Sequence, residues 1–431
     1  MPRLADPKFA PDCTLLLDGE PVAARRGESV AVALVASGRP LLARSAKYHR
    51  PRGPFCLSGT CGNCLVRVDG EPNRRACETP CRDGMRVATQ NAWPTARHDL
   101  LAAIDRLSGE GLDVHHMLTR PKALNRLLVS VSRRLSGLGR LPDAPGDSPA
   151  PADAESFEAL VVGAGPAGLG AAEALAGAGR RVLLVERAER LGGRLRARLG
   201  LPGDPPLDWG EAVASGVRRA GGEVAQATTA VDLFLHGESG ACLLLADGDP
   251  PRPRLIHARR VVVASGGAAR PPLFEGGDLP GVFAARALAR CLAEEGLVAG
   301  RRAAVLGAGA EAEAVAARLG DAGMDAELVS APVETARGGA RVRALSLADG
   351  RTLRCDTVAE ARPPAPAPEL LRAAGVAATW DEAAEAFAPD VGDDGRTALP
   401  WLFAAGEVAA PVDAAGAADR GRRAGEAAAR G

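Results

Sequence analysis

FEALVVGAGPAGLGAAEALAGAGRRVLLVER, residues 157–187, has the pattern of a β-strand, a glycine turn, a helix and a second strand. Gly163, Gly165 and Gly168 occupy the positions of a G-x-G-x-x-G motif, directly after the first apolar strand. In such a unit the first glycine makes the tight turn, the second lets a pyrophosphate approach, and the third allows the helix to pack on the strand. The helix N-terminus then presents its positive dipole end to the phosphates. The stretch therefore predicts a Rossmann-type dinucleotide-binding domain.

Further motifs favour FAD as the dinucleotide. Glu186 follows the second strand at the position expected to hold the adenosine ribose hydroxyls. The Leu191–Arg194 turn, RRVVVASGG at 259–267 and LPWLFAAGEVA at 399–409 resemble the corresponding segments of two-dinucleotide-domain flavoproteins. That resemblance implies that Glu407, where the superfamily usually has Asp, holds the ribityl chain. The expected cofactor-binding residues are Gly163, Gly165, Pro166, Ala167, Gly168, Glu186, Gly193, Arg194, Gly406 and Glu407. A Rossmann domain that binds a different ligand is the alternative.

A second motif lies in PFCLSGTCGNCLVRVDGEPNRRACETP, residues 54–80. Cys56, Cys61, Cys64 and Cys77 have the spacing C-x4-C-x2-C-x12-C, and its first part matches the plant-type ferredoxin pattern. Two irons need four thiolates, and a glycine-punctuated loop can curl around the sulfides with its N–H groups directed at the cluster. The spacing therefore predicts that these four cysteines bind a [2Fe–2S] cluster.

Two other readings of these cysteines remain open. Zinc ribbons favour two C-x2-C knuckles, whereas here only one pair has that spacing. Buried free cysteines are the second alternative. Cys81 is either a spare ligand or, more simply, a small buried residue.

A second dinucleotide-like unit begins at RRAAVLGAGAEAEAVAARLGDAGMDAELVSA, residues 301–331. Gly307 and Gly309 start the motif well. However, Glu311 and Glu313 stand at the helix N-terminus, where they would repel a pyrophosphate. The expected second strand is followed by Ala331 and Pro332 and not by a ribose-binding acid. We therefore interpret this unit as a shortened remnant that does not bind NAD(P), while a working NAD site with unusual contacts stays the alternative.

These motifs suggest five segments in an α/β chain. We expect a ferredoxin-like β-grasp domain of α+β type at 1–95, with strands at Cys13–Leu17 and Leu65–Val68. A helical segment and a Pro-rich linker should follow at 96–155. The FAD domain is expected at 156–300 and, after a reduced NAD-domain-like insertion at 301–360, at 361–431, with a strand at Trp401–Ala405 and a terminal helix.

Composition narrows the class of protein. The chain has 53 Lys and Arg residues and 53 Asp and Glu residues, so its formal net charge is zero. A general nucleic-acid or membrane-surface binder would be basic. We see no apolar run long enough for a membrane span and no signal-peptide pattern at the N-terminus. Because four of the nine cysteines cluster in one short loop, a cytoplasmic protein with one metal site fits better than a secreted disulfide framework.

The stretches SAKYHRPRGPF, residues 45–55, and ATQNAWPTARHDL, residues 88–100, resemble the α subunit of heterotetrameric sarcosine oxidase. The cysteine loop resembles the ferredoxin-like domain of the related hydrogen cyanide synthase, opine oxidase and amino-acid dehydrogenase complexes. The four cluster cysteines, which sarcosine oxidase α subunits commonly lack, place the chain with the cluster-bearing relatives. The chain stops at Gly431, so we expect no folate-binding C-terminal half and no folate-coupled sarcosine chemistry.

The resemblance implies an electron-transfer subunit that works with a second, amine-oxidase-like flavoprotein subunit. The leading hypothesis is thus an FAD and [2Fe–2S] subunit of an amino-acid or secondary-amine oxidase or dehydrogenase complex. The alternatives are a stand-alone NAD(P)H-dependent oxidoreductase and an assembly subunit with empty cofactor sites. His115 and His116 form a doublet in the helical segment, and we interpret them as surface residues. We identify no side chain with the features of a substrate-side acid or base, so no catalytic residue is assigned.

Overall fold

The computed structural model describes residues 3–46, 48–100, 121–123, 126, 152–248, 251–382 and 384–430. Contacts divide the chain into two units. The first comprises Met1–Gly146 and Pro271–Arg362, and the second comprises Asp147–Arg270 and Pro363–Gly431. Most of the predicted helical segment and linker, including His115 and His116, lies outside the described residues.

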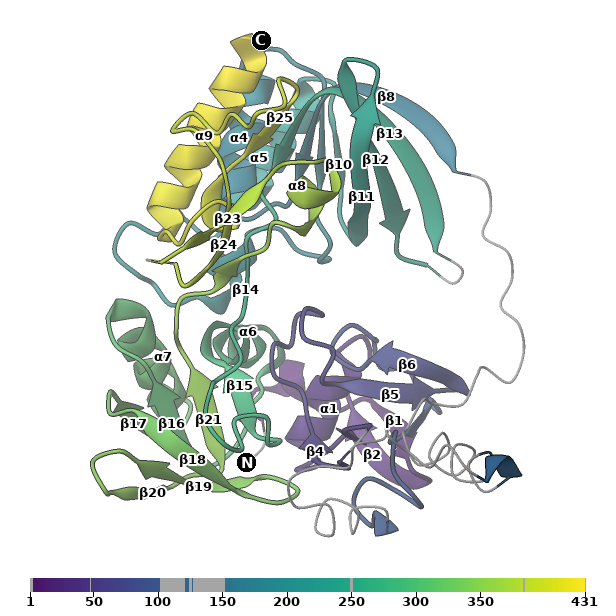
Figure 1. The fold of residues 1–431 in the computed structure, drawn as a ribbon, viewed down its shortest axis with the longest axis vertical. Coiled ribbons are helices and arrows are strands. Elements are labelled where there is room, and N and C mark those ends of the chain that lie inside the picture. The colour runs from purple at the N-terminus through teal and green to yellow at the C-terminus, as the bar shows by residue number, and fades with distance from the viewer. Residues whose placement is uncertain are drawn as a thin grey trace. The chain divides into compact units, whose positions relative to one another are not determined.

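The N-terminal part of the first unit is built on a five-stranded sheet in the order β2-β1-β7-β5-β6 (Figure 1). The strands are β1 (Cys13–Leu17), β2 (Glu20–Ala24), β5 (Leu65–Val68), β6 (Glu71–Arg75) and β7 (Arg86–Ala88). β1 and β2 form an antiparallel hairpin, and β1 pairs in parallel with β7. The short strands β3 (Ala43–Arg44) and β4 (Pro51–Arg52) pair beside this sheet, and a 3-10 turn spans Pro7–Phe9.

The helix of this part, α1 (Val30–Ala36), is apolar on all sides, and every one of its residues is buried. The Ser29 side chain accepts a hydrogen bond from the Val32 N–H and so caps the helix. Cys13, Leu15 and Leu17 alternate along β1 on its buried face. The two strands expected at Cys13–Leu17 and Leu65–Val68 are present with those bounds, in an arrangement of the β-grasp type.

The later part of the first unit has a four-stranded parallel sheet in the order β15-β21-β16-β17. Its strands are β15 (Val282–Ala284), β16 (Arg302–Leu306), β17 (Asp325–Val329) and β21 (Thr357–Glu360). Helices α6 (Ala285–Glu295) and α7 (Ala310–Asp321) follow β15 and β16. A three-stranded antiparallel sheet contains β18 (Val333–Gly338), β19 (Val342–Leu347) and β20 (Thr352–Arg354).

The insertion therefore starts earlier than its predicted boundary at residue 301. Residues from Pro271 onward group with it, because β15 and α6 belong to its parallel sheet and not to the sheet of the second unit. The fingerprint at 307–312 identified the second strand–helix repeat, whereas the first repeat, β15–α6, carries no glycine motif that the sequence could reveal.

The second unit is a seven-stranded sheet in the order β10-β9-β8-β13-β12-β11, with β25 paired to β13. The strands are β8 (Asp153–Val162), β9 (Val182–Val185), β10 (Glu223–Ala225), β11 (Thr228–His236), β12 (Ser239–Ala246), β13 (Arg252–Val263) and β25 (Leu402–Ala404). The pairs β10–β9, β9–β8, β8–β13 and β13–β25 are all parallel. On the other side of β13, the strands β12 and β11 extend the sheet as an antiparallel meander. This is the predicted Rossmann arrangement, and the α/β fold class is confirmed.

The helices α4 (Pro166–Gly177), α5 (Trp209–Arg219) and α9 (Ala414–Arg430) accompany this sheet, and α9 lies beside α4 (Figure 1). Small residues allow that approach, since a Cβ on Gly421 would lie 1.9 Å from the Ala167 carbonyl oxygen. Smaller elements complete the unit. They are η3 (Gly193–Ala197), η4 (Gly406–Val408), α8 (Glu369–Ala373), the pair β14 (Gly267–Ala268) and β22 (Ala365–Pro366), and the pair β23 (Ala378–Asp381) and β24 (Ala386–Pro389). In the described part of the chain, no helix combines the length and apolarity that crossing a membrane requires.

Candidate cofactor sites

The loop between β4 and β5 carries three of the four predicted cluster ligands, and Cys77 follows the end of β6. The thiol of Cys56 lies in hydrogen-bond contact with Cys61 and Cys77, and Cys77 also contacts Cys64. The structure therefore brings all four predicted ligands together. Cys56 and Cys64 are buried, while Cys61 and Cys77 are partly exposed at the edge of the site.

Backbone amides of the loop point at these sulfurs. Ser58 and Thr60 donate N–H groups to the Cys56 sulfur at 3.5 and 3.3 Å, and Gly59 donates to the Cys77 sulfur at 3.2 Å. Gly59 takes φ +75°, a backbone conformation that other residues rarely adopt. Amide donors of this kind stabilise negative charge on thiolates and sulfides. Four convergent thiols with amide donors are the donor set that a [2Fe–2S] cluster requires.

The hydrogen bonds among the thiols shift their pKa values in opposite directions. The pKa of Cys56 is lowered because it accepts hydrogen bonds from Cys61 and Cys77 and from backbone donors. The pKa of Cys77 is raised for the converse reason, since its thiol donates to Cys56 and Cys64.

Across the described residues, His, Cys, Asp and Glu side chains form no group of three arranged around a single metal ion. The four thiols differ from such a group because the ligands of a [2Fe–2S] cluster are distributed over two irons.

Cys81 lies apart from these contacts. It is buried, and burial raises the pKa of its thiol, with further contributions from Glu28 and Cys13. Its backbone N–H donates to the Glu28 carbonyl at 2.7 Å. These surroundings favour the interpretation of Cys81 as a buried small residue over that of a spare ligand.

The turn between β8 and α4 contains the three fingerprint glycines. Gly163 has φ +99°, and a Cβ there would lie 2.4 Å from the Ala264 carbonyl oxygen. A Cβ on Gly168 would lie 1.7 Å from the Gly163 oxygen. Gly165 is different, because its φ is −76° and the nearest atom to a Cβ would be the Gly193 Cα at 3.8 Å. The protein itself does not require glycine at 165, so the space above it suits a group such as a pyrophosphate.

Residues far apart in sequence surround this turn. Gly193, with φ +51°, leaves no room for a Cβ, which would lie 2.7 Å from the Gly165 Cα. Pro166 and Ala167 form the first turn of α4, and a Cβ on Gly406 would lie 2.6 Å from the Ala167 side chain. The structure thus gathers the Gly-Gly turn and the start of η4 at the N-terminus of α4, where the helix dipole favours an anion.

Three charged side chains complete the candidate FAD site. The Glu186 carboxylate accepts N–H groups from Ala164 at 2.8 Å and from Ala188 at 2.9 Å, which fixes it at the end of β9. Arg194 donates to Glu407 at 3.0 Å and to the Val412 carbonyl at 2.7 Å, and both charged side chains are about nine-tenths buried. The acid at 407 is thus held by an arginine of the same site, a contact that the sequence did not reveal. The glycine cradle, the helix N-terminus and the fixed acid fit FAD.

The second dinucleotide-like part has a different arrangement at the equivalent turn. The Arg286 guanidinium, on α6, holds the Glu311 carboxylate through Nε and Nη2, at 2.9 Å each. Glu311 is in the first turn of α7, directly after the G-x-G motif. A carboxylate with its own arginine partner therefore stands where a dinucleotide would place its phosphates, which supports the interpretation of this part as a remnant.

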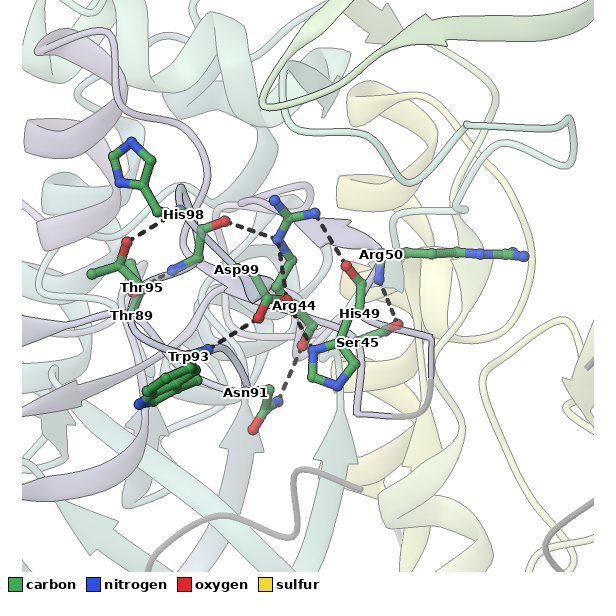
Figure 2. Close-up of polar contacts among 11 residues, drawn as sticks. Arg44, Ser45, His49, Arg50, Thr89, Asn91, Trp93, Thr95, His98 and Asp99 are labelled. Carbon is green, nitrogen blue, oxygen red and sulfur yellow. Dashed lines mark hydrogen bonds and ion pairs between the residues drawn. The ribbon is translucent and has the colours of Figure 1, made fainter. Parts of the chain in front are cut away.

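The two stretches 45–55 and 88–100, whose roles were not predicted, come together around one buried contact between a histidine and a carboxylate (Figure 2). The His49 Nδ1 lies 2.9 Å from Asp99 Oδ2, and both side chains are almost fully buried. Arg44 donates to the carbonyls of Ala96 at 2.8 Å and His49 at 3.1 Å. The family resemblance singled out both stretches in the sequence, but the pairing of His49 with Asp99 depends on the fold.

Families of known domains match both cofactor regions. The 2Fe-2S iron–sulfur cluster binding domain matches residues 11–92, and the NAD(P)-binding Rossmann-like domain matches residues 161–220. Among solved structures, L-proline dehydrogenase from P. horikoshii superimposes with a TM-score of 0.75 and 21% identity, over 98% of this chain and 74% of that one. At this identity the likeness shows the fold.

Curated relatives match at higher identity. The sarcosine oxidase α subunit of Rhizobium meliloti is 33% identical over 330 residues, which are 72% of this chain and 33% of the relative. The hydrogen cyanide synthase protein HcnA of Pseudomonas aeruginosa is 49% identical over 80 residues, which are 19% of this chain and 76% of HcnA. One of the opine oxidase subunits of Rhizobium meliloti is 32% identical over 198 residues, 44% of this chain and 41% of the relative.

The chain spans about a third of the length of the sarcosine oxidase α subunit that it matches. The relatives are named as subunits of oxidoreductases, and the matches support the oxidoreductase class together with the two predicted cofactors, FAD and a [2Fe–2S] cluster. The chain belongs to the family that includes sarcosine oxidase α subunits, hydrogen cyanide synthase HcnA and the matching opine oxidase protein.

Proposed function

We propose that this chain is the FAD- and [2Fe–2S]-containing electron-transfer subunit of an amino-acid or secondary-amine oxidase or dehydrogenase complex. The observation that carries the proposal is the convergence of four thiols and three amide donors in a chain that also contains a dinucleotide site. Flavin accepts electrons in pairs and the cluster passes them singly, so together they link hydride chemistry to single-electron transfer.

The chain's own residues bind and orient these groups. Cys56, Cys61, Cys64 and Cys77 would hold the cluster, with loop amides stabilising its negative charge. The N-terminus of α4 and the space above Gly165 would receive the pyrophosphate, and Glu186 the adenosine ribose. Arg194 and Glu407 would line the remaining part of the FAD site.

The partner in this proposal is a second, amine-oxidase-like flavoprotein subunit that oxidises the substrate. The names of the relatives support a multi-subunit assembly. The gathering of four thiols in one loop, which is typical of a metal site and not of a disulfide framework, supports a reducing, cytoplasmic location. A stand-alone NAD(P)H oxidoreductase is less well supported, since the Glu311 carboxylate at the second dinucleotide turn is held by Arg286.

The test compares two electron donors under anaerobic conditions. The purified chain should contain iron, acid-labile sulfide and flavin, and NADH or NADPH should leave the flavin oxidised. After co-expression with an amine-oxidase-like flavoprotein subunit, an amino acid or secondary amine should bleach the flavin and generate the EPR signal of the reduced cluster. Rapid bleaching of the single chain by NADH or NADPH would overturn the proposal.

A further inference from the structure

The first turn of the cluster loop is held by the second dinucleotide-like part of the same unit. The Phe55 carbonyl accepts a hydrogen bond from the Ala284 N–H at 3.0 Å, at the end of β15. Two residues further on, the Leu57 carbonyl accepts one from Arg290 Nη2 at 2.6 Å, across 233 residues of sequence. Cys56 stands between these two carbonyls, so contacts from β15 and α6 fix the backbone on both sides of a proposed cluster ligand.

The contact from Arg290 also determines where an amide donor points. A trans peptide unit is planar, with its C=O and N–H directed to opposite sides. The carbonyl of Leu57 and the N–H of Ser58 belong to one such unit. Its carbonyl end is held by Arg290 while its N–H end donates to the Cys56 sulfur at 3.5 Å. The guanidinium therefore orients and polarises a donor to the cluster sulfur.

The backbone at this position needs such support. Leu57 has φ +49°, a left-handed conformation that is unfavourable for residues with a Cβ. Its side chain is buried, and Cys56 and Phe55 beside it are buried as well. A hydrogen bond from a charged donor to the Leu57 carbonyl offsets the unfavourable conformation.

Arg290 places a permanent positive charge beside the Leu57 carbonyl. Its side chain is about four-fifths buried, and its Nη1 lies 3.4 Å from Glu294 on the next turn of α6. A guanidinium stays protonated throughout the accessible pH range. Hydrogen bonds to the sulfurs and nearby positive charge both favour the reduced, more negative state of an iron–sulfur cluster.

We propose that Arg290 is a positioning residue for the iron–sulfur cluster, which raises the cluster's reduction potential by fixing the Leu57–Ser58 peptide against Cys56. The inference rests on the proposed cluster ligands. It assigns a role to the second dinucleotide-like part that nucleotide binding does not require: its first helix holds the cluster loop.

The same helix supplies a matched control. Arg286 precedes Arg290 by one helical turn and is also an arginine in an ion pair, with Glu311 in place of the cluster loop. Arg286→Gln removes from α6 a partly buried guanidinium that is held by Glu311. Arg290→Gln removes the positive charge beside the Leu57 carbonyl, whereas Arg290→Lys keeps the charge but loses the fixed geometry of the guanidinium.

The experiment is an EPR-monitored redox titration of the cluster in the full chain, with iron, labile sulfide and flavin measured in each sample. We expect Arg290→Gln to weaken the electron affinity of the cluster about tenfold, which moves its one-electron reduction potential by about 59 mV to more negative values. The g-values should change as well, because the hydrogen bond at Cys56 is altered. Arg290→Lys should recover part of the shift, and Arg286→Gln should leave both the potential and the g-values as in the wild type.

Three outcomes would overturn the proposal. Unchanged potential and g-values in Arg290→Gln, with full iron and sulfide, would refute the role of Arg290 while leaving the electron-transfer function intact. An equal shift of the reduction potential in Arg286→Gln would show that the effect comes from the total charge of α6 and not from the contact between Arg290 and Leu57. A wild-type chain without iron and labile sulfide would refute the cluster assignment, and the present inference with it.

Discussion

Arg194 donates a hydrogen bond to Glu407 at 3.0 Å, joining two residues that lie 213 positions apart in the chain. The pair links the Gly-Gly turn after β9 to the segment that follows β25, so one salt bridge joins two segments of the candidate FAD site. Because both side chains are largely buried, each charge is compensated by the opposite charge of the other.

Removal of the Glu407 carboxylate should therefore weaken flavin binding. Glu407→Ala removes the carboxylate that accepts a hydrogen bond from the buried Arg194, and we expect about a tenfold loss of FAD affinity, or about 1.4 kcal/mol. Glu407→Gln keeps an acceptor for Arg194 and should lie between Ala and wild type. Fluorescence titration of the flavin-free protein measures the affinities. Glu426→Gln, an exposed position on α9, is the control, and wild-type affinity in Glu407→Ala would contradict the assignment.

A side chain at Gly165 should exclude FAD without unfolding the chain. The backbone at 165 is ordinary, and the nearest protein atom to a Cβ would lie 3.8 Å away, so Gly165→Glu places bulk and negative charge in the pyrophosphate position. We expect loss of bound flavin with the iron content unchanged. Gly177→Glu, at the exposed end of the same helix, should retain FAD. Stoichiometric flavin in Gly165→Glu would refute this site.

Replacement of one cluster cysteine should abolish the EPR signal of the reduced protein while FAD stays bound. Cys61→Ser removes a thiolate from the four-thiol site, and serine oxygen is a poorer ligand for iron–sulfur clusters. Cys81→Ala is the matched control, since Cys81 is buried near Glu28 and outside the thiol contacts, and it should keep the signal. A normal signal in Cys61→Ser, or its loss in Cys81→Ala, would show that the ligand assignment is wrong.

Cluster removal should make a defined set of thiols reactive at pH 8. Iodoacetamide attacks the thiolate, and burial raises the pKa of Cys355 to about 11 and that of Cys242 to about 12. A raised pKa means less thiolate at pH 8, about one part in a thousand for Cys355, with reactivity gained only as the pH rises toward 11. In the cluster-free protein Cys56 should be alkylated before Cys242 and Cys355, because hydrogen bonds from Cys61 and Cys77 lower the pKa of its thiol, and the cluster should protect Cys56 in the loaded protein. Mass spectrometry of peptides reads this out, and equal labelling of Cys56 with and without the cluster would contradict it.

Much of both cofactor sites follows from local sequence. The cysteine spacing predicted four thiols in one loop, and the structure brings their side chains into contact because the loop is short and contains glycine at turns such as Gly59. The Rossmann turn also follows from local sequence. A Cβ at Gly163 or Gly168 would collide with backbone atoms of the same strand–turn–helix unit or of the segment after β13. The role of these residues as ligands stays a prediction that the experiments above test.

Tertiary structure alone decided which distant partners complete the sites. Arg290 on the Leu57 carbonyl, Arg194 on Glu407 and His49 on Asp99 join segments whose periodicity and composition give no hint of one another. The same holds for β15–α6. We expected residues up to 300 to belong to the FAD domain, whereas β15 pairs into the sheet that contains β16. Local spacing determines turns and ligand loops because the chain itself limits their geometry, whereas long-range pairs depend on how sheets and helices pack, which no short stretch encodes.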